Sequence, residues 1–94
     1  MVNELLKYVA ENHLEDVFHF NDRKGIKPYE IEVISYPNGT YAVMVNGNGD
    51  YGEVETHYGI SEAEMCKVCY KWLDFHLKLR NFEVVNGNVV NKTR

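Results

Sequence analysis

Two cysteines, Cys66 and Cys69, form a C-x-x-C, a spacing that both zinc sites and thiol redox centres use, and His76 follows seven positions later. A redox pair is activated at a helix N-terminus, but Cys66 lies more than a turn inside the helix expected over residues 61–80. A structural zinc ion needs four ligands, and only these three side chains lie within reach of one another. The pattern therefore favours packing in the core, with metal binding and redox chemistry as alternatives.

The expected helix has an apolar face, because its residues turn by about 100° each. That face contains Met65, Cys69, Trp72, Leu73, His76 and Arg80, and the opposite stripe contains Lys67, Lys71, Asp74 and Lys78. Trp72 lies in the middle of the apolar face, so we expect it to anchor the helix on a sheet. A histidine among apolar neighbours is most often hydrogen-bonded to backbone, and we predict this role for His76.

Residues 46–57 superficially resemble a calcium-binding loop. The first three ligand positions are filled by Asn46, Asn48 and Asp50. However, Tyr51 replaces the glycine of the sharp turn, and His57 replaces the closing bidentate glutamate. The segment is therefore predicted to be a tight β-turn.

Glu53, Glu55 and His57 alternate along one expected strand and could in principle transfer protons. The sequence supplies no nucleophile or oxyanion hole beside them. It also contains no phosphate-binding loop, dinucleotide fingerprint or nucleophile elbow. We therefore expect no enzymatic activity, no metal and no cofactor.

The elements that position these residues follow from hydrophobic periodicity. Leu5, Leu6, Val9 and His13 indicate a short helix over residues 3–13. Strand patterns cover 16–20, 29–36, 40–46 and 51–58, and Ser61 with Glu64 matches a capping box for the long helix. Asn-Gly pairs predict a hairpin turn at 38–39 and, within 82–90, either a second short hairpin or one strand and a tail. The order predicts one α+β domain over residues 1–94: an antiparallel meander of three to five strands, a short N-terminal helix and one long helix on one face.

Charge is distributed unevenly along the chain, which has a net charge of −4. Residues 28–66 contain seven carboxylates and no lysine or arginine, so this segment carries −7. The preceding segment carries −1 and the following one +4. This asymmetry exceeds what a solvated face requires and favours a basic partner.

A two-residue turn at Asn38-Gly39 places Tyr36 opposite Tyr41 and sorts the side chains onto two faces. The predicted core face holds Tyr29, Ile31, Val33, Ala42, Met44 and Val54. The predicted partner-binding face holds Glu30, Glu32, Tyr36, Tyr41, Asp50, Tyr51, Glu53 and Glu55. Tyrosines are enriched in protein interfaces, and carboxylates steer a basic partner. A solvated face with tyrosines chosen for β-propensity is the open alternative.

The acidic segment argues against direct nucleic-acid binding, which needs a basic patch. No apolar run spans a membrane and the N-terminus lacks a secretion signal, so we expect a cytoplasmic protein. In general character the chain is similar to bacterial immunity proteins and small phage-encoded inhibitors, although no motif places it in a family. The leading hypothesis is an immunity-type inhibitor or antitoxin that neutralises a basic toxin such as a nuclease. The alternatives are a small oligomeric metabolic or nucleotide-handling enzyme and an adaptor that self-associates through a strand edge.

Overall fold

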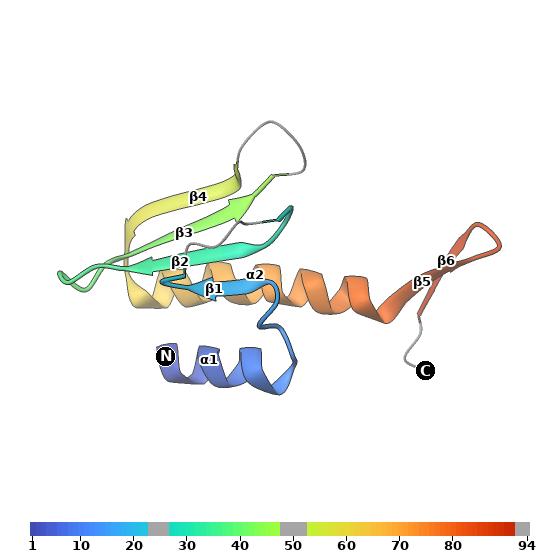
Figure 1. Cartoon of the computed structure of the whole chain (residues 1–94), viewed down its shortest axis with the longest axis horizontal. Helices are drawn as coiled ribbons and strands as arrows, with labels where there is room; N and C mark the ends of the chain where they lie inside the picture. Colours follow the sequence, from blue (N-terminus) through green and yellow to red (C-terminus); the bar gives the residue numbers. More distant parts are fainter. Residues whose placement is uncertain (23–26, 48–52, 92–94) are drawn as a thin grey trace.

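The structure of the protein, a computed structural model, describes residues 1–22, 27–47 and 53–91. Figure 1 shows the order of the elements along the chain. They are α1 (Val2–Glu11), β1 (Phe18–Phe20), β2 (Ile31–Ser35), β3 (Tyr41–Asn46), β4 (Glu53–Ile60), α2 (Glu62–Asn81), β5 (Phe82–Val85) and β6 (Asn88–Asn91). The predicted α+β class is confirmed, with the long helix packed on the sheet.

The main sheet has the strand order β1-β2-β3-β4. β2, β3 and β4 form the predicted antiparallel meander. β1 departs from that prediction, because it pairs parallel to β2 with Phe18 opposite Ile31. The chain crosses back after β1 and enters β2 from the same end, so the two strands run in the same direction.

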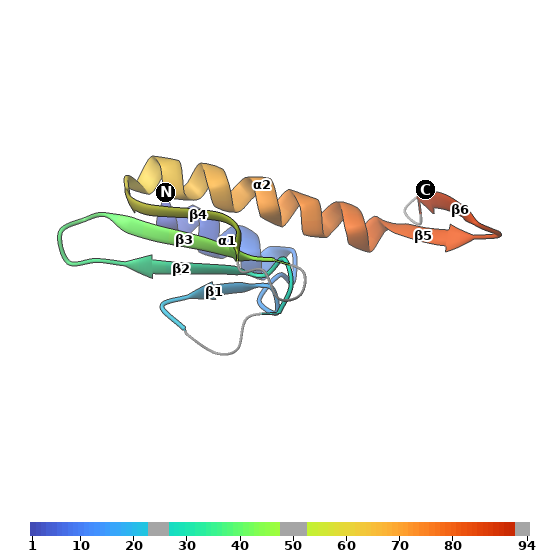
Figure 2. The same cartoon turned by 90° about the horizontal axis from the view of Figure 1, so that it is seen from above.

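Both helices cover one face of this sheet (Figure 2). Side chains from α1, α2, β1, β2 and β3 and from the α1–β1 connection form one buried cluster. Its members are Leu5, Val9, Leu14, Val17, Phe18, Ile31, Val33, Val43, Val45, Met65, Cys66, Cys69 and Leu73. This cluster joins the first and last helices of the main body to the central strands and is the hydrophobic core.

The C-x-x-C lies inside this core, as predicted. Cys69 is fully buried and Cys66 is 7% exposed. Burial raises the pKa of both thiols, and the Cys69 thiol contacts the Met65 sulfur at 3.7 Å. A raised pKa disfavours the thiolate that metal binding and redox exchange need.

α2 begins at the predicted capping box. The Ser61 hydroxyl accepts a hydrogen bond from the Glu64 amide at 3.2 Å and donates to the Glu64 carboxylate at 3.3 Å. At the other end, the Arg80 guanidinium donates at 2.7 Å to the His13 carbonyl and at 2.7 Å to the Asp16 carboxylate. These contacts connect the last turn of α2 to the segment after α1.

α1 ends earlier than predicted, at Glu11. Leu5 and Val9 are buried, but Leu6 is 38% exposed, because the neighbour of an inward helical residue points elsewhere. His13 lies beyond the helix with a φ of 55°. Amide-to-carbonyl bonds from His13 to Ala10 and from Leu14 to Val9 close a Schellman motif, in which His13 takes the position that glycine usually has.

β5 and β6 form the predicted second Asn-Gly hairpin. Asn86 and Gly87 both have positive φ, 52° and 81°, and Val85 pairs with Asn88 across the turn. This geometry is typical of a two-residue type I′ turn. The hairpin projects beyond the end of α2, away from the main sheet (Figures 1 and 2).

Candidate protein-binding face

The β2–β3 hairpin contains one more loop residue than predicted. The Gly39 amide donates to the Tyr36 carbonyl at 3.0 Å, and the Tyr36 amide donates to the Thr40 carbonyl at 2.9 Å. Gly39 has a φ of 87°, but Asn38 does not have a positive φ. Pro37 explains the difference, because its fixed φ suits the first central position of a type I turn, which a left-handed glycine then completes.

This turn shifts the register of β3 by one residue. Tyr41 lies opposite Ser35, not opposite Tyr36 as predicted. A one-residue slip moves every side chain of a strand to the other face. The helix-covered face therefore receives Val43 and Val45, which are fully buried. Tyr41 also packs against the core, so its predicted place on the partner-binding face is wrong.

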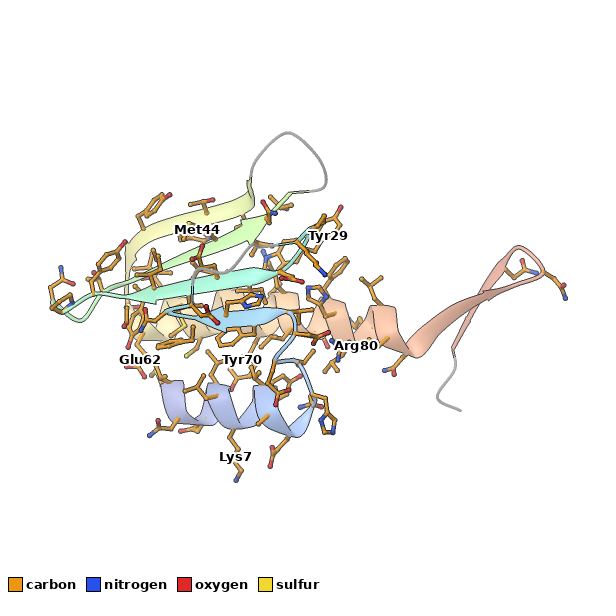
Figure 3. The ribbon with its side chains drawn as sticks, viewed as in Figure 1. Lys7, Tyr29, Met44, Glu62, Tyr70 and Arg80 are labelled. Carbon is orange, nitrogen blue, oxygen red and sulfur yellow. The ribbon has the colours of Figure 1, made fainter. Side chains whose placement is uncertain are left out.

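Ala42 and Met44 were predicted in the core and lie on the opposite side of the sheet. Met44 pairs with Glu32, and Ala42 pairs with Ile34. Ala42 is fully buried by its surroundings even on this side, whereas Met44 is half-buried. Figure 3 marks Met44 on β3.

The two faces of β4 are also exchanged relative to the prediction. Glu55 lies opposite Val45 and His57 opposite Val43, so both side chains share the helix-covered face. Val54, predicted in the core, is 47% exposed, and Tyr58 is 67% exposed. Beyond Tyr58 the pairing shifts by one residue, where Gly59 has a φ of 64°, and the shift returns Ile60 to a position opposite Tyr41.

The Glu55 carboxylate forms a polar cluster with three side chains. Nε2 of His57 lies 2.6 Å from one oxygen, and the other accepts from Lys71 Nζ at 2.6 Å and from Trp72 Nε1 at 2.8 Å. Burial raises the pKa of the Glu55 carboxyl, but the hydrogen bonds from His57, Lys71 and Trp72 outweigh burial and lower that pKa to about 2. Glu55 is therefore an ionised link between β4 and α2.

Trp72 contacts the sheet through this link and through aromatic packing. Its ring stacks on Tyr29 with centroids 6.3 Å apart and meets Phe75 edge-on at 5.4 Å. The side chain is half-buried and packs against the core cluster. Trp72 thus connects α2 to the sheet, as predicted, although from the margin of the core.

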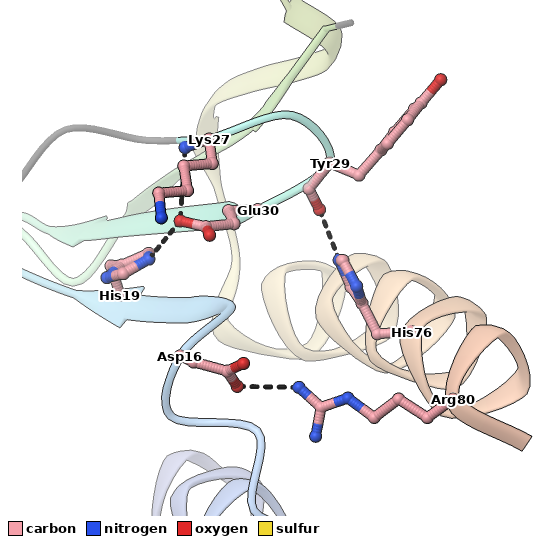
Figure 4. Close-up of polar contacts among 7 residues, drawn as sticks. All are labelled: Asp16, His19, Lys27, Tyr29, Glu30, His76 and Arg80. Carbon is pink, nitrogen blue, oxygen red and sulfur yellow. Dashed lines mark hydrogen bonds and ion pairs between the residues drawn. The ribbon is translucent and has the colours of Figure 1, made fainter.

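Glu30 was predicted to contact a partner, but its carboxylate has contacts within the chain. It lies 2.9 Å from His19 Nε2 and accepts from the Lys27 amide at 3.3 Å (Figure 4). The residue is 9% exposed. In the same region His76 Nε2 lies 2.6 Å from the Tyr29 carbonyl, which confirms the predicted backbone contact of this buried histidine.

The remaining predicted site residues do not gather on one surface. Glu32 is half-buried on β2, and Tyr36 is 41% exposed in the hairpin loop. Glu53 opens β4 opposite Asn46, but its side chain lies outside the described part of the chain. The predictions for Asp50 and Tyr51 also fall outside the described residues.

The sheet side that the helices leave uncovered is called the open face below. Its members are Glu32, Ile34, Ala42, Met44, Val54, Thr56 and Tyr58. Sequence reasoning missed Val54 and Tyr58 as surface residues. The only available signal was Pro37 before the Asn-Gly pair, since it disfavours the two-residue turn that set the predicted register.

Two further properties concern the described residues only. No three His, Cys, Asp or Glu side chains in these ranges come close enough together to bind a metal ion. Neither described helix combines the length and the apolar content needed to cross a bilayer.

Comparison with known proteins adds no relative. No protein-family model, no curated protein and no solved structure matches this chain. A functional proposal therefore rests on the geometry of the sheet and the charges of the chain.

Proposed function

We propose that this chain is a small cytoplasmic inhibitor of the immunity type. It neutralises a basic protein partner, such as a toxin nuclease, by covering the surface with which that partner acts. The observation that supports the proposal is the open face, where exposed Val54 and Tyr58 lie on a sheet that also bears the Glu32 carboxylate. Exposed apolar side chains grouped on one face mark protein-interaction sites.

The apolar part of the open face supplies the contact area. Tyr58 is 67% exposed and Val54 is 47% exposed, and both come from β4. Met44 on the adjacent strand β3 and Ile34 on β2 are half-buried on the same face. Tyrosine is frequent among the residues that dominate binding energy, because it buries a large area with little loss of entropy.

The charge of the chain supplies the preference for a basic partner. The segment that contains β2, β3 and β4 carries seven carboxylates and no lysine or arginine. Glu30 and Glu55 are held in internal contacts, so they contribute to the negative potential and not to direct contacts. A negative potential accelerates encounter with a cationic partner and repels nucleic acid.

The test begins with affinity capture of the partner by the full chain from a source lysate, followed by titration with the purified pair. Tyr58→Ala should weaken binding by about 30-fold, corresponding to about 2 kcal/mol for an anchor residue. Glu32→Lys should slow association and reduce its salt dependence. Lys67→Glu, a charge reversal at an exposed position on α2, is the matched control and should leave the affinity nearly unchanged.

The proposal would be contradicted by an acidic partner, or by a basic partner whose binding survives Tyr58→Ala and Glu32→Lys but is lost with Lys67→Glu. That second result would place the interface on the helix side. Circular dichroism of each variant separates a lost contact from a lost fold.

A further inference from the structure

β4 is an edge of the main sheet, and no other described strand pairs with its outer side. It pairs with β3 on one side only, and it is the longest strand, Glu53–Ile60, whereas the other edge strand, β1, has three residues. An edge strand presents a row of backbone amides and carbonyls without partners, and proteins usually block such edges with lysine, proline or a short strand. β4 contains no lysine, arginine or proline, and its blocking devices are limited to the inward-pointing Glu55 and the register shift near Gly59.

We propose that β4 pairs antiparallel with β4 of a second copy of the chain, across a two-fold axis at Thr56. This pairing joins the two sheets into one continuous sheet and gives a self-complementary interface, as two-fold symmetry requires. Both pairs of helices then lie on the same side of the joined sheet.

The sidedness of β4 restricts the register. Glu55 and His57 face the helices, whereas Val54, Thr56 and Tyr58 belong to the open face. Side chains directly opposite each other in an antiparallel pair lie on the same side of the sheet. The two-fold axis must therefore lie midway between the two copies of one residue, so that this residue is opposite itself.

Centring the axis on Thr56 makes three kinds of favourable pair. Glu55 lies opposite His57 of the second copy, which places a carboxylate next to an imidazole. Val54 lies opposite Tyr58 of the second copy, an aromatic–β-branched pair formed by two exposed side chains. Cross-strand pairs of these types stabilise sheets.

Thr56 itself lies at the proposed axis. There it faces Thr56 of the second copy, and threonine pairs on neighbouring strands stabilise a sheet.

Neighbouring registers are less favourable. An axis at Glu55 places two Glu55 carboxylates directly opposite each other, and an axis at His57 removes both the Glu55–His57 and the Val54–Tyr58 pairs. An axis at Val54 places Glu53 opposite Glu55 of the second copy, and like charges directly opposite each other destabilise a strand pair. An axis at Tyr58 carries the pairing through Gly59, where the β3–β4 register already shifts, and into the start of α2. The second copy is therefore the occupant that this edge fits, at the register centred on Thr56.

The first test measures the mass of the full chain in solution by sedimentation. The unmodified chain should form a dimer. Thr56→Lys, which brings two like charges together at the axis, should raise the dimer dissociation constant at least tenfold. Glu32→Lys, on β2 of the same open face, should leave the dimer intact, so failure of the edge pairing is distinguished from failure of the proposed partner surface.

The second test reads the register. Under mild oxidation Thr56→Cys should form a covalent dimer on a denaturing gel, because the two residues face each other at the axis. Val54→Cys is the control, since the two copies of residue 54 are about 13 Å apart along the strands. The chain without these substitutions reports any background from Cys66 and Cys69. A monomer at all accessible concentrations, or faster cross-linking of Val54→Cys than of Thr56→Cys, would overturn the proposal.

Discussion

The two faces of the main sheet differ in burial although the same strands supply both. On the helix-covered face Ile31, Val33, Val43 and Val45 are fully buried. On the open face Met44 is half-buried, whereas Tyr58 is mostly exposed. Hydrophobicity alone therefore did not decide which side of β3 became the core. The turn before β3 decided it, through the register.

The largest expected effect concerns the helix layer over the covered face. Leu73 is fully buried on α2, and Leu79 on the same helix is 54% exposed. Leu73→Ala should lower the free energy of unfolding by about 2–5 kcal/mol, because it removes buried methyl groups and leaves a cavity. Leu79→Ala should change it by less than about 0.5 kcal/mol. Urea denaturation measures both, and equal losses would contradict the assigned helix orientation.

A pair of identical substitutions compares the two faces directly. Val43 is fully buried on the covered face, and Val54 is 47% exposed on the open face. Val43→Thr should cost about 1–3 kcal/mol, since it buries a hydroxyl in an apolar environment. Val54→Thr should stay within about 0.5 kcal/mol. If Val54→Thr were the more destabilising of the two in thermal unfolding, the register described for β4 would be wrong.

A smaller effect is expected from the Glu55 carboxylate on the covered face. Glu55→Gln removes the charge of the acceptor, and Trp72→Phe removes the donor, of the 2.8 Å hydrogen bond between β4 and α2. We expect a coupling of about 1 kcal/mol in a double-mutant cycle of unfolding free energies, because a hydrogen bond to a charged group contributes more than a neutral one. Additive losses would show that the two side chains do not interact.

The contribution of Glu55 to stability should also change with pH. The pKa of Glu55 is about 2 in the folded chain, compared with ~4.3 for an unperturbed glutamate. A lowered folded pKa means that the stabilisation is fully present above the unfolded pKa and is lost as the pH falls through the folded pKa. The stability difference between the unmodified chain and Glu55→Gln should therefore be constant near pH 7 and shrink between about pH 5 and pH 2. A difference that grows on acidification would contradict the low pKa.

Features determined by local residues were predictable from the sequence. The hydrogen bond from the Glu64 amide to the Ser61 hydroxyl follows from short-range bonding at a helix start, and the burial of Cys69 and His76 follows from helix periodicity. The Asn86-Gly87 turn also formed as predicted, because no proline precedes it. Asn38-Gly39 is the same dipeptide after Pro37, and it formed a longer loop.

The candidate site was less predictable, because it depends on contacts between distant segments. β3 reads Tyr-Ala-Val-Met-Val, so both of its faces are apolar and alternation cannot choose between them. Glu55 would be expected to face solvent, but the indole of Trp72 and the ammonium of Lys71 make its inward position favourable. Those donors come from a helix that follows later in the chain, and strand periodicity contains no information about them.

The contacts of α2 with α1 and with the segment after α1 constrain the order in which the molecule can fold. The Val2 amide donates to the Glu62 carboxylate, and Arg80 binds the segment after α1. During synthesis α1 therefore has no completed helix layer to join until α2 has been made. A nascent chain that stops after β4 leaves Leu5 and Val9 without Leu73 and the other core residues of α2. Because long-range contacts close late, the first half of the chain depends on prompt completion, or on a chaperone, to avoid exposing its apolar strands.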